Sequence, residues 1–316
     1  MFLGIDLGGT TCTFGLLDES GKIHDEYEID THQHDGPDVM LPRLAEAAKK
    51  VLNGAKGTVT SAGIGVPGAV KHAEGICVYA PNLTGWKNLP VGPILSEKIG
   101  IPVHVLNDAN AASLGEARFG AGQGATDMLV LTLGTGIGSG LILDGELRLG
   151  ASERGAEIGH ITVDINDKRG SAGNVGTLES MCGRDAIVWR ALRALTWGRE
   201  SILHQTCPDL SQLTPRHIAE AAAQGDDLAK RVWVETASYL AVGIVNVVFT
   251  ADVSRVIIAG GVAQAGEVLF EPLRYAVAAR TSLFTFDASQ IVPAKLGPQA
   301  GLIGAAQWAR ERGASD

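Results

Sequence analysis

The chain has 316 residues, of which 45% are hydrophobic and 19% charged, and its formal net charge is −9. This composition is typical of a folded globular protein and excludes an extended disordered chain. The acidic balance, without a basic stripe to offset it, argues against nucleic acid as the main partner, although a small anion can still bind locally.

Targeting and redox signals predict a soluble cytoplasmic protein. The first ten residues include an acid at position 6 and lack the basic region that begins a secretory signal. The longest uncharged run, 236–251, is short for a membrane span and is interrupted by Asn246, so we interpret it as a buried core helix. The cysteines are scattered without a CxxC pair, as expected for reduced thiols: Cys12, Cys77, Cys182 and Cys207.

The first third of the chain is predicted to alternate strands and helices. A glycine-rich turn, "LGGT", joins the first two strands, and a more polar third strand follows. Apolar residues at helical spacing predict a helix over 38–55 that ends at Asn-Gly. A later strand leads into a helix that begins near Asp108. Strands are expected at 2–6, 11–18, 23–30 and 61–70.

The same order of elements then restarts. Residues 127–147 again predict strand, glycine-rich turn and strand, and helices are expected within 178–195 and 214–250, the latter with a Thr cap followed by Pro. A strand at 255–263 runs into Gly-Gly, and a helix at 300–312 closes the chain. The repeated order indicates a weak internal duplication, whose two halves would hold a ligand between them.

Both glycine-tipped hairpins are candidate phosphate sites. Backbone N–H groups at such tips form an anion nest, and Thr10, Thr11 and Thr135 add hydroxyl donors. Neither hairpin matches a P-loop or a dinucleotide fingerprint, and each alone is more often an ordinary tight turn. The pair is less ordinary because Asp6, just before the first tip, can hold Mg²⁺ through water.

Asp108 is a candidate base. It stands where a buried strand meets a helix, so an N-cap is the alternative role, and the sequence favours neither. The small neighbours Ala109, Ala111 and Ala112 leave room for a ligand. The helix N-terminus is expected to keep this carboxylate ionised rather than to raise its pKa strongly.

The stretch 157–180 could be a metal site, a catalytic dyad or a clamp for a polar ligand. Glu157 and His160 are three residues apart and would share a face of a helical turn. A lone His is more often structural than a ligand. With Glu179 and Asn107, however, the set offers acceptors and planar donors suited to sugar hydroxyls.

Nine segments, taken together and in order, resemble the ROK family of sugar kinases and sugar-responsive repressors. The segments are "DLGGTT", "GIGVPG", "PNLTGW", "NDANAASLGE", "LGTGIGSG", "EIGH", "GTLE", "IIAGGV" and "LGPQAGLIGAA". The resemblance implies an α/β, actin-like ATPase (ribonuclease H-like) fold of two duplicated domains with a cleft between them. We expect a smaller N-terminal domain of 1–107 plus 302–316 and a larger one of 108–301.

The resemblance also implies ATP-dependent phosphorylation of a hexose, glucose first, at its 6-hydroxyl, with Asp108 as general base. It places the hexose at Gly68, Asn82, Asn107, Asp108, Glu157, His160 and Glu179. It places ATP at Gly8, Gly9, Thr10, Thr11, Thr135, Gly136, Gly260 and Gly261, and Mg²⁺ near Asp6.

One segment departs from the family pattern. Many relatives have a CxCGxxGCLE run that binds zinc with the His of "EIGH", whereas this chain has "GSAGNVGTLE". Gly170, Ala172 and Thr177 replace the thiolates, and Cys182 comes too late to substitute for them. We therefore expect no structural zinc. The loop would instead be ordered by its own polar side chains, namely Asp164, Asn166, Asp167, Arg169 and Asn174.

Several alternatives remain open at this stage. Fructose, mannose, N-acetylmannosamine or N-acetylglucosamine could replace glucose, and polyphosphate could replace ATP. A sugar-sensing repressor is the rival of a different class; such repressors carry a DNA-binding segment ahead of the region that resembles this chain, and here the hairpin begins at residue 2. The expected partners are a hexose and a second copy in a homodimer, with neither nucleic acid nor membrane.

Overall fold

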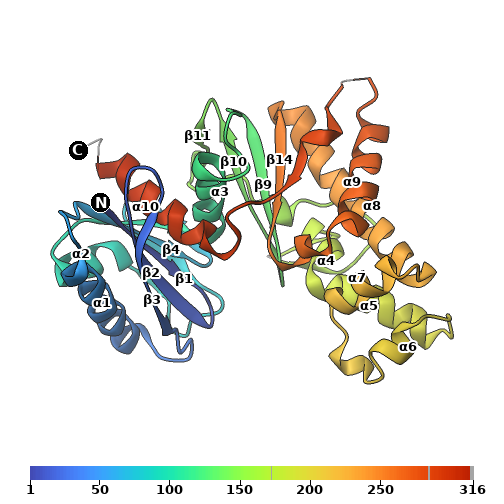
Figure 1. Cartoon of the computed structure of the whole chain (residues 1–316), viewed down its shortest axis with the longest axis horizontal. Coiled ribbons are helices and arrows are strands. Elements are labelled where there is room, and N and C mark those ends of the chain that lie inside the picture. Colours follow the sequence, from blue (N-terminus) through green and yellow to red (C-terminus); the bar gives the residue numbers. More distant parts are fainter. Residues whose placement is uncertain (172, 284, 314–316) are drawn as a thin grey trace.

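Two α/β halves lie side by side, each built on a five-stranded mixed sheet (Figure 1). The structure is a computed structural model and describes residues 1–171, 173–283 and 285–313. The first sheet has the order β3-β2-β1-β4-β8 and the second β11-β10-β9-β14-β15. The first contains β1 (Phe2–Leu7), β2 (Thr11–Leu17), β3 (Ile23–Asp30), β4 (Ser61–Val66) and β8 (Val103–Asn107). The second contains β9 (Met128–Leu133), β10 (Ile137–Leu143), β11 (Glu146–Leu147), β14 (Arg255–Ala259) and β15 (Ile291–Pro293).

The two sheets share one topology. In each, the first two strands form an antiparallel hairpin, and two later strands add in parallel beside the first strand of that hairpin. This common order confirms the internal duplication that the sequence predicts. Because both hairpins occupy the same place in their sheets, their two glycine-rich tips are equivalent points of the two halves.

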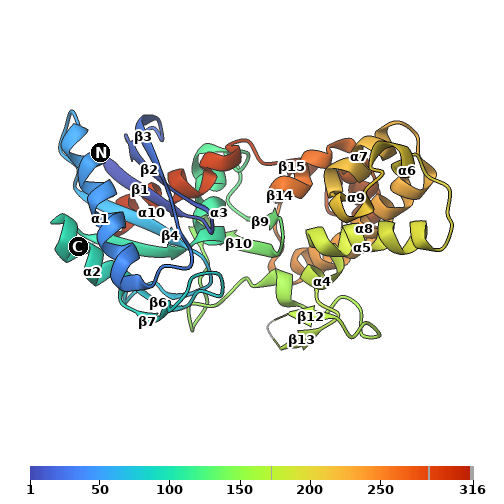
Figure 2. The ribbon, with the colours of Figure 1, turned by 90° about the horizontal axis from the view of Figure 1, so that it is seen from below.

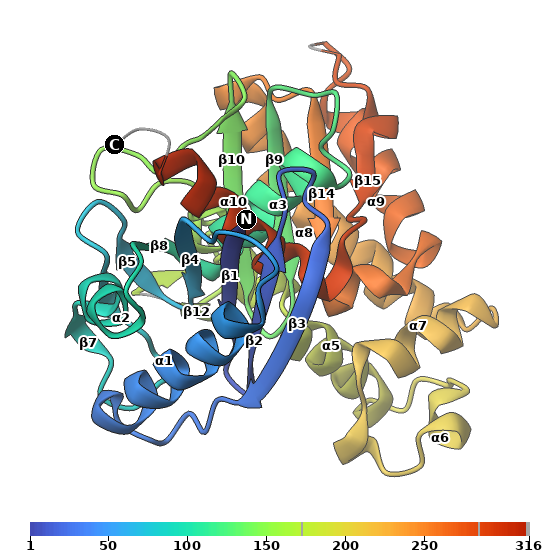
Figure 3. The same ribbon diagram turned by 60° about the vertical axis from the view of Figure 1, so that its left-hand side comes forward.

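Two helices lie between the sheets and join the halves (Figure 3). They are α3 (Asp108–Phe119) and α10 (Ala300–Gly313). The helix α10 packs on the first sheet so closely that a Cβ at Gly63 would lie 1.8 Å from the carbonyl oxygen of Ala305. The helices also touch each other, since a Cβ at Gly304 would lie 1.7 Å from the carbonyl oxygen of Ala111. Small residues are therefore required where the two halves meet.

The outer helices complete each half. In the first, α1 (Pro37–Gly54) and α2 (Val91–Ile99) cover the sheet face opposite α10. In the second, α8 (Asp227–Ala251) and α9 (Glu267–Arg280) pack together beside the sheet. By length and composition α8 could cross a membrane, but 61% of its most apolar window is buried inside the protein. The sequence interpretation of 236–251 as a core helix is thus confirmed.

The remaining elements are short. Figure 2 shows the strands β6 and β7 of one half and β12 and β13 of the other along the same side of the molecule. These strands belong to two small sheets: β5 (Ala69–Lys71), β6 (Ile76–Tyr79) and β7 (Lys87–Leu89), and β12 (Gly170–Ser171) and β13 (Asn174–Val175). The other helices are α4 (Leu178–Cys182), α5 (Arg184–Thr196), α6 (Leu203–Thr206) and α7 (Pro215–Ala223). Single 3₁₀ turns are η1 (Ile158–His160), η2 (Leu210–Gln212), η3 (Gly261–Ala265), η4 (Ala288–Gln290) and η5 (Gly297–Gln299).

Most predicted elements are present, with three corrections. The helical region 178–195 is broken at Gly183, whose ψ of 162° is extended, and 214–250 is broken between α7 and α8. The strand expected over 61–70 ends at Val66. The Thr cap is confirmed: the Thr214 hydroxyl accepts from the N–H of His217 in a capping box.

Candidate active site

The sequence left open whether Asp108 caps helix α3 or acts as a base, and the hydrogen bonds at the junction of β8 and α3 distinguish these two roles. Asn107 is the N-cap, because its Oδ1 accepts a hydrogen bond from the N–H of Asn110 at 3.0 Å. Asp108 is therefore the first residue of the helix, and its Oδ1 accepts from the N–H of Ala109 at 2.8 Å and from Asn107 Nδ2 at 3.0 Å. Asn107 Nδ2 also donates to the Gly68 carbonyl at 2.9 Å. With the cap supplied by its neighbour, Asp108 is available for chemistry.

Burial dominates the electrostatics of this carboxylate. Burial, the largest cause, and the negative charge of Glu157 together raise the pKa of Asp108 to about 6, against hydrogen bonds that lower it. The expectation that the helix N-terminus would prevent a strong rise is therefore wrong, because desolvation outweighs the helix end. Burial and the charge of Asp108 likewise raise the pKa of Asp6 to about 6. The carboxyl groups of Asp6, in β1, and Asp108, just after β8 of the same sheet, thus share one electrostatic environment.

Glu157 precedes the short 3₁₀ turn η1 and His160 is its last residue, so the two lie on one turn, as their spacing predicts. Their side chains approach to 4.0 Å between His160 Nε2 and Glu157 Oε2. Burial raises the pKa of Glu157, the charge of His160 opposes that rise, and the charge of Glu179 adds to it. Glu157 therefore lies within electrostatic reach of Asp108, His160 and Glu179.

A buried serine that the sequence interpretation missed holds this segment in place. The Ser139 hydroxyl donates to the carbonyl of Ala156 and accepts from the N–H of Ile158 at 2.9 Å, so it bonds the chain on both sides of Glu157. Ala156 has a φ of 62°, which a non-glycine residue rarely adopts. The only sequence signal was a hydroxyl within the glycine-rich "GTGIGSG", where the pattern predicts a buried strand.

Glu179 lies between Glu157 and His160, which we call the clamp, and the tip of the second hairpin. It stands in the first turn of α4, which Thr177 caps by accepting from the N–H of Ser180 at 3.2 Å. Its Oε2 accepts from the N–H of Ile137, the first residue of β10, at 2.9 Å. Sequence reasoning assigned Glu179 to the hexose alone and did not foresee this contact.

The glycine-rich turns proposed for ATP phosphates are present in both halves. At the first tip the N–H of Gly8 bonds the Thr11 carbonyl at 2.9 Å, and the side chain of Thr10 is exposed. At the second, the N–H of Gly134 bonds the Gly136 carbonyl at 2.9 Å, and Thr135 is exposed. Exposed hydroxyls above tight backbone turns suit an incoming anion.

Gly260 and Gly261 join this second tip. They follow β14, which runs parallel to β9, so both strands end at the same edge. Gly260 has a φ of 87°, and a Cβ there would lie 2.3 Å from the Leu133 carbonyl oxygen, so only glycine fits. The predicted adenosine position is therefore beside the predicted phosphate position.

Asn82 is placed less directly. It is exposed in the turn between β6 and β7. The nearby residue Ala80 packs on Gly68, since a Cβ at Gly68 would lie 3.0 Å from the Ala80 Cα. Since Gly68 is bonded to Asn107, this turn borders the site. A contact of Asn82 with the hexose remains a prediction.

Comparison with known proteins places this arrangement in a family. The family model described as "ROK family" matches residues 2–312. The chain belongs to the ROK family. Among curated ROK relatives, glucokinase of Thermotoga maritima is 34% identical over 98% of this chain and 97% of its own length. A xylose repressor of Caldicellulosiruptor bescii is 30% identical over 96% of this chain and 76% of its own.

Solved structures of ROK proteins have the same fold. The ROK family glucokinase of Streptomyces griseus, in complex with glucose and AMPPNP, superposes with a TM-score of 0.80 at 34% identity, covering 98% of this chain and 99% of that one. The ROK hexokinase of Thermus thermophilus superposes with a TM-score of 0.85 at 31% identity, covering 100% of this chain and 99% of that one. The actin-like ATPase fold expected from the resemblance is thereby confirmed.

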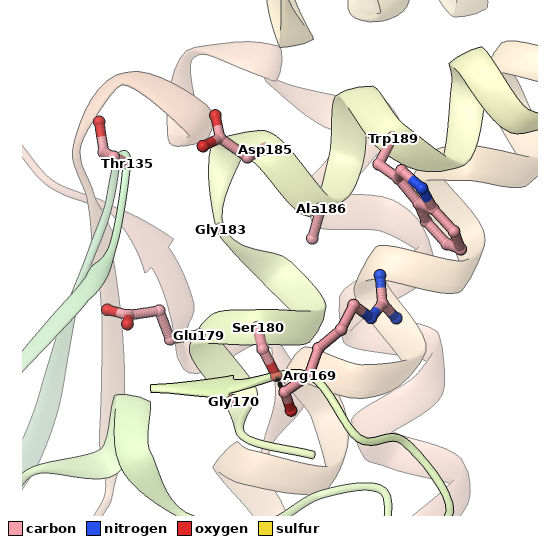
Figure 4. A pocket seen from close by; sticks show the side chains of 9 residues that line it. All are labelled: Thr135, Arg169, Gly170, Glu179, Ser180, Gly183, Asp185, Ala186 and Trp189. Carbon is pink, nitrogen blue, oxygen red and sulfur yellow. Dashed lines mark hydrogen bonds between the residues drawn. The ribbon is translucent and has the colours of Figure 1, made fainter. Parts of the chain in front are cut away.

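A cavity of about 280 Å³ adjoins this ROK site (Figure 4). Thr135 and Glu179 border it, so it is continuous with both the hairpin tip and the clamp. Figure 4 shows Ala186 and Trp189 of α5 on one side, with the Arg169 side chain reaching toward Trp189. Its lining is Thr135, Arg169, Gly170, Glu179, Ser180, Gly183, Asp185, Ala186 and Trp189.

The loop without the zinc cysteines is held by polar contacts. Arg169 pairs with Asp167, with Nη2 2.5 Å from Oδ2, and stacks over the Trp189 ring at 4.5 Å. The Tyr239 hydroxyl donates to Asp164 at 3.1 Å. The predicted pairing of Arg169 with an acid is confirmed, and the loop is anchored to α5 and α8.

Two of the three positions where relatives carry zinc-binding cysteines belong to regular secondary structure or its cap in this chain. Gly170 lies in β12, Thr177 caps α4, and Ala172 lies outside the described residues. Cys182 is a fully buried core residue, and this burial raises the pKa of its thiol to about 12. Within the described parts of the chain, no group of three or more His, Cys, Asp or Glu side chains could hold a metal ion. The absence of zinc from the protein remains a prediction.

Proposed function

We propose that this ROK protein is an ATP-dependent hexose kinase that phosphorylates the 6-hydroxyl of glucose. The observation that carries the proposal is Asp108, a carboxylate that is freed from capping by Asn107 and whose pKa of about 6 suits a general base near neutral pH. Glucokinases at 31–34% identity over nearly the whole chain support glucose as the acceptor.

Each group of residues has a role in the proposed reaction. Asp108 accepts the proton of the sugar hydroxyl while the oxygen of that hydroxyl attacks the γ-phosphate. Asn107, Glu157, His160 and Glu179 orient the sugar through its other hydroxyls, with Gly68 and Asn82 at the edge. Positioning of this kind supplies much of the lowering of the barrier in phosphoryl transfer.

The donor would lie across the two hairpin tips. The backbone amides and hydroxyls there would bind the phosphates, and Gly260 and Gly261 would leave space for adenosine. The S. griseus relative binds AMPPNP, which supports ATP over polyphosphate as the donor. The residues proposed for the phosphates are Gly8, Gly9, Thr10, Thr11, Thr135 and Gly136.

Asp6 fits a role in holding Mg²⁺ through water. Within the described residues no hydrogen bond reaches its carboxylate, and its pKa is raised by burial and by Asp108. A divalent cation would relieve both effects by supplying positive charge. When bound, Mg²⁺ would neutralise charge on the transferring phosphate.

A sugar sensor is the second candidate, because a xylose repressor matches at 30% identity. A sugar sensor needs the residues that bind the sugar, but it does not need a general base because it transfers no phosphate. Asp108, with its raised pKa, favours turnover over binding alone. Other hexoses and N-acetylated sugars are alternative acceptors, since the residues of the clamp do not distinguish a 2-hydroxyl from a 2-acetamido group.

The two halves are proposed to move as units and to close on the substrates. Residues 1–107 with 302–313 would form the smaller lobe and 108–301 the larger, while 314–316 of the expected boundary lie outside the described residues. Closure would exclude water from the γ-phosphate. We also propose that the protein is a cytoplasmic homodimer. Light scattering in solution, which measures the molar mass of the assembly, would test the dimer.

A panel assay tests the proposal. The purified protein is incubated with Mg²⁺ and either ATP or polyphosphate, against glucose, mannose, fructose, N-acetylmannosamine and N-acetylglucosamine. The highest kcat/KM is expected for glucose with ATP. Turnover of none of these pairs, together with measurable sugar binding, would favour the sensor.

A further inference from the structure

Glu179 makes a contact with the donor-side hairpin that a sugar ligand does not need. Its Oε2 accepts from the N–H of Ile137 at 2.9 Å, immediately after the turn that carries Thr135. A Cβ at Gly136 would lie 2.4 Å from this Oε2, and its three nearest neighbours would all be atoms of Glu179. In the described residues no donor contacts the other oxygen, Oε1.

The segment after Glu179 is fastened to the same turn. The N–H of Arg184 donates to the Gly134 carbonyl at 2.9 Å. A Cβ at Gly183 would lie 2.8 Å from the Thr135 carbonyl oxygen, so glycine is needed for this approach. Figure 4 shows Glu179 directed toward the hairpin that carries Thr135. The turn and the α4–α5 junction are therefore one connected unit.

The turn keeps its own donors for a second ligand. In the described structure the backbone N–H groups of Thr135 and Gly136 donate no hydrogen bond, whereas that of Ile137 is satisfied by Glu179. Because Glu179 fixes the end of the turn, it also fixes the direction in which these two N–H groups point. Their alignment would govern how well the turn binds an anion.

We infer that Glu179 couples the two substrate sites, with Oε1 binding the sugar while Oε2 holds the donor turn. The inference rests on the sugar-binding role of Glu179 in the proposed function. A sugar that orders Glu179 also orders the turn, so each substrate should strengthen the binding of the other. Binding linkage requires the two effects to be equal.

The test changes the donor turn and measures sugar affinity with no nucleotide present. Gly136→Ala would push the Glu179 carboxylate off the Ile137 N–H, and only this flexible side chain has to move. Gly134→Ala is the matched control, because its Cβ would have only the Gly136 carbonyl oxygen near it, at 4.0 Å. The glucose Kd is read by calorimetry or tryptophan fluorescence.

We expect Gly136→Ala to raise the glucose Kd about tenfold, as loss of a hydrogen bond to a charged group would, and Gly134→Ala to leave it within about twofold. AMPPNP should tighten glucose binding in the wild type and in Glu157→Gln but not in Glu179→Ala. Equal glucose Kd values for the two glycine variants would overturn the coupling.

Glu179→Ala separates the two ideas. If it leaves the glucose Kd unchanged, the proposed sugar role of Glu179 is wrong. If it weakens glucose binding but the effect of AMPPNP persists, the sugar role stands and the coupling is refuted. Thermal melting of each variant checks that the fold is intact.

Discussion

Replacing Asp108 by Asn should nearly abolish turnover while leaving glucose binding measurable. The amide keeps the shape and can still accept the hydrogen bond from the Ala109 N–H, but it cannot take up a proton. General bases contribute about 10²- to 10⁴-fold, so we expect kcat to fall at least about 100-fold. A variant that keeps more than about a tenth of wild-type kcat would refute the assignment.

The pKa of Asp108 predicts a pH profile as well. With a pKa of about 6, the carboxylate is ionised in about one molecule in eleven at pH 5 and in about ten in eleven at pH 7. Activity limited by this base should therefore fall about tenfold between pH 7 and pH 5. An aspartate at its ordinary pKa of 3.8 would lose almost nothing over that range.

The assay should follow glucose 6-phosphate in quenched samples, so that the pH dependence of a coupling enzyme does not enter. Glucose is kept well below its KM at each pH, because the rate then follows kcat/KM, which reports the pKa of Asp108 in the free enzyme. A profile that is flat from pH 7 to pH 5 would refute the link between burial of Asp108 and catalysis.

The same shift has a consequence for stability. The pKa of Asp108 is higher in the folded protein than in the unfolded chain, so protonation of Asp108 stabilises the folded state. This stabilisation is complete below about pH 3.8 and is lost as pH rises through about 6. Keeping Asp108 ionised at pH 7 thus costs about 1–3 kcal/mol, allowing for its partial exposure. Asp108→Asn should raise Tm at pH 7 but not at pH 4, and a lower Tm at pH 7 would contradict this.

Other outcomes follow from the clamp and its supports. Glu157→Gln and His160→Ala should raise the sugar KM far more than the ATP KM, and similar increases in both would indicate a general defect. Ser139→Ala should raise the sugar KM about tenfold through loss of the two bonds around Glu157. The matched Ser113→Ala, another buried hydroxyl, should not, since in the described part of the chain its hydroxyl donates to the Ala109 carbonyl within α3; equal effects would argue against the role of Ser139. Elemental analysis should find no stoichiometric zinc, and excess Mg²⁺ should restore activity after EDTA; one tightly held zinc per chain would overturn the metal-free loop.

Local sequence patterns predicted much of the fold because the signals were strong and repeated. Alternating and continuous apolar runs marked most strands of the two sheets, although not β15, and glycine-rich turns marked the two tips. The helix break at Gly183 was missed because its cause is a long-range contact, the approach to the Thr135 carbonyl. The small sheet of β5 to β7 was missed because its strands are short and carry little apolar alternation.

The candidate site was predictable in its residue types but not in its connections. The sequence suggested Asp108 and Glu157, yet could not tell that Asn107 would take the cap. It also underestimated burial at Asp108, since desolvation depends on what packs around the helix start. The contact of Glu179 with Ile137 joins residues far apart in the chain, and no local pattern indicates it.

The central claim is tested most directly by the products of one reaction. Glucose, ATP and Mg²⁺ are incubated with the wild-type protein and with Asp108→Asn, and phosphorus NMR identifies the products. We predict glucose 6-phosphate and ADP in equal amounts from the wild type and almost none from the variant. Glucose binding without any ADP or sugar phosphate, or equal product from both proteins, would contradict the account.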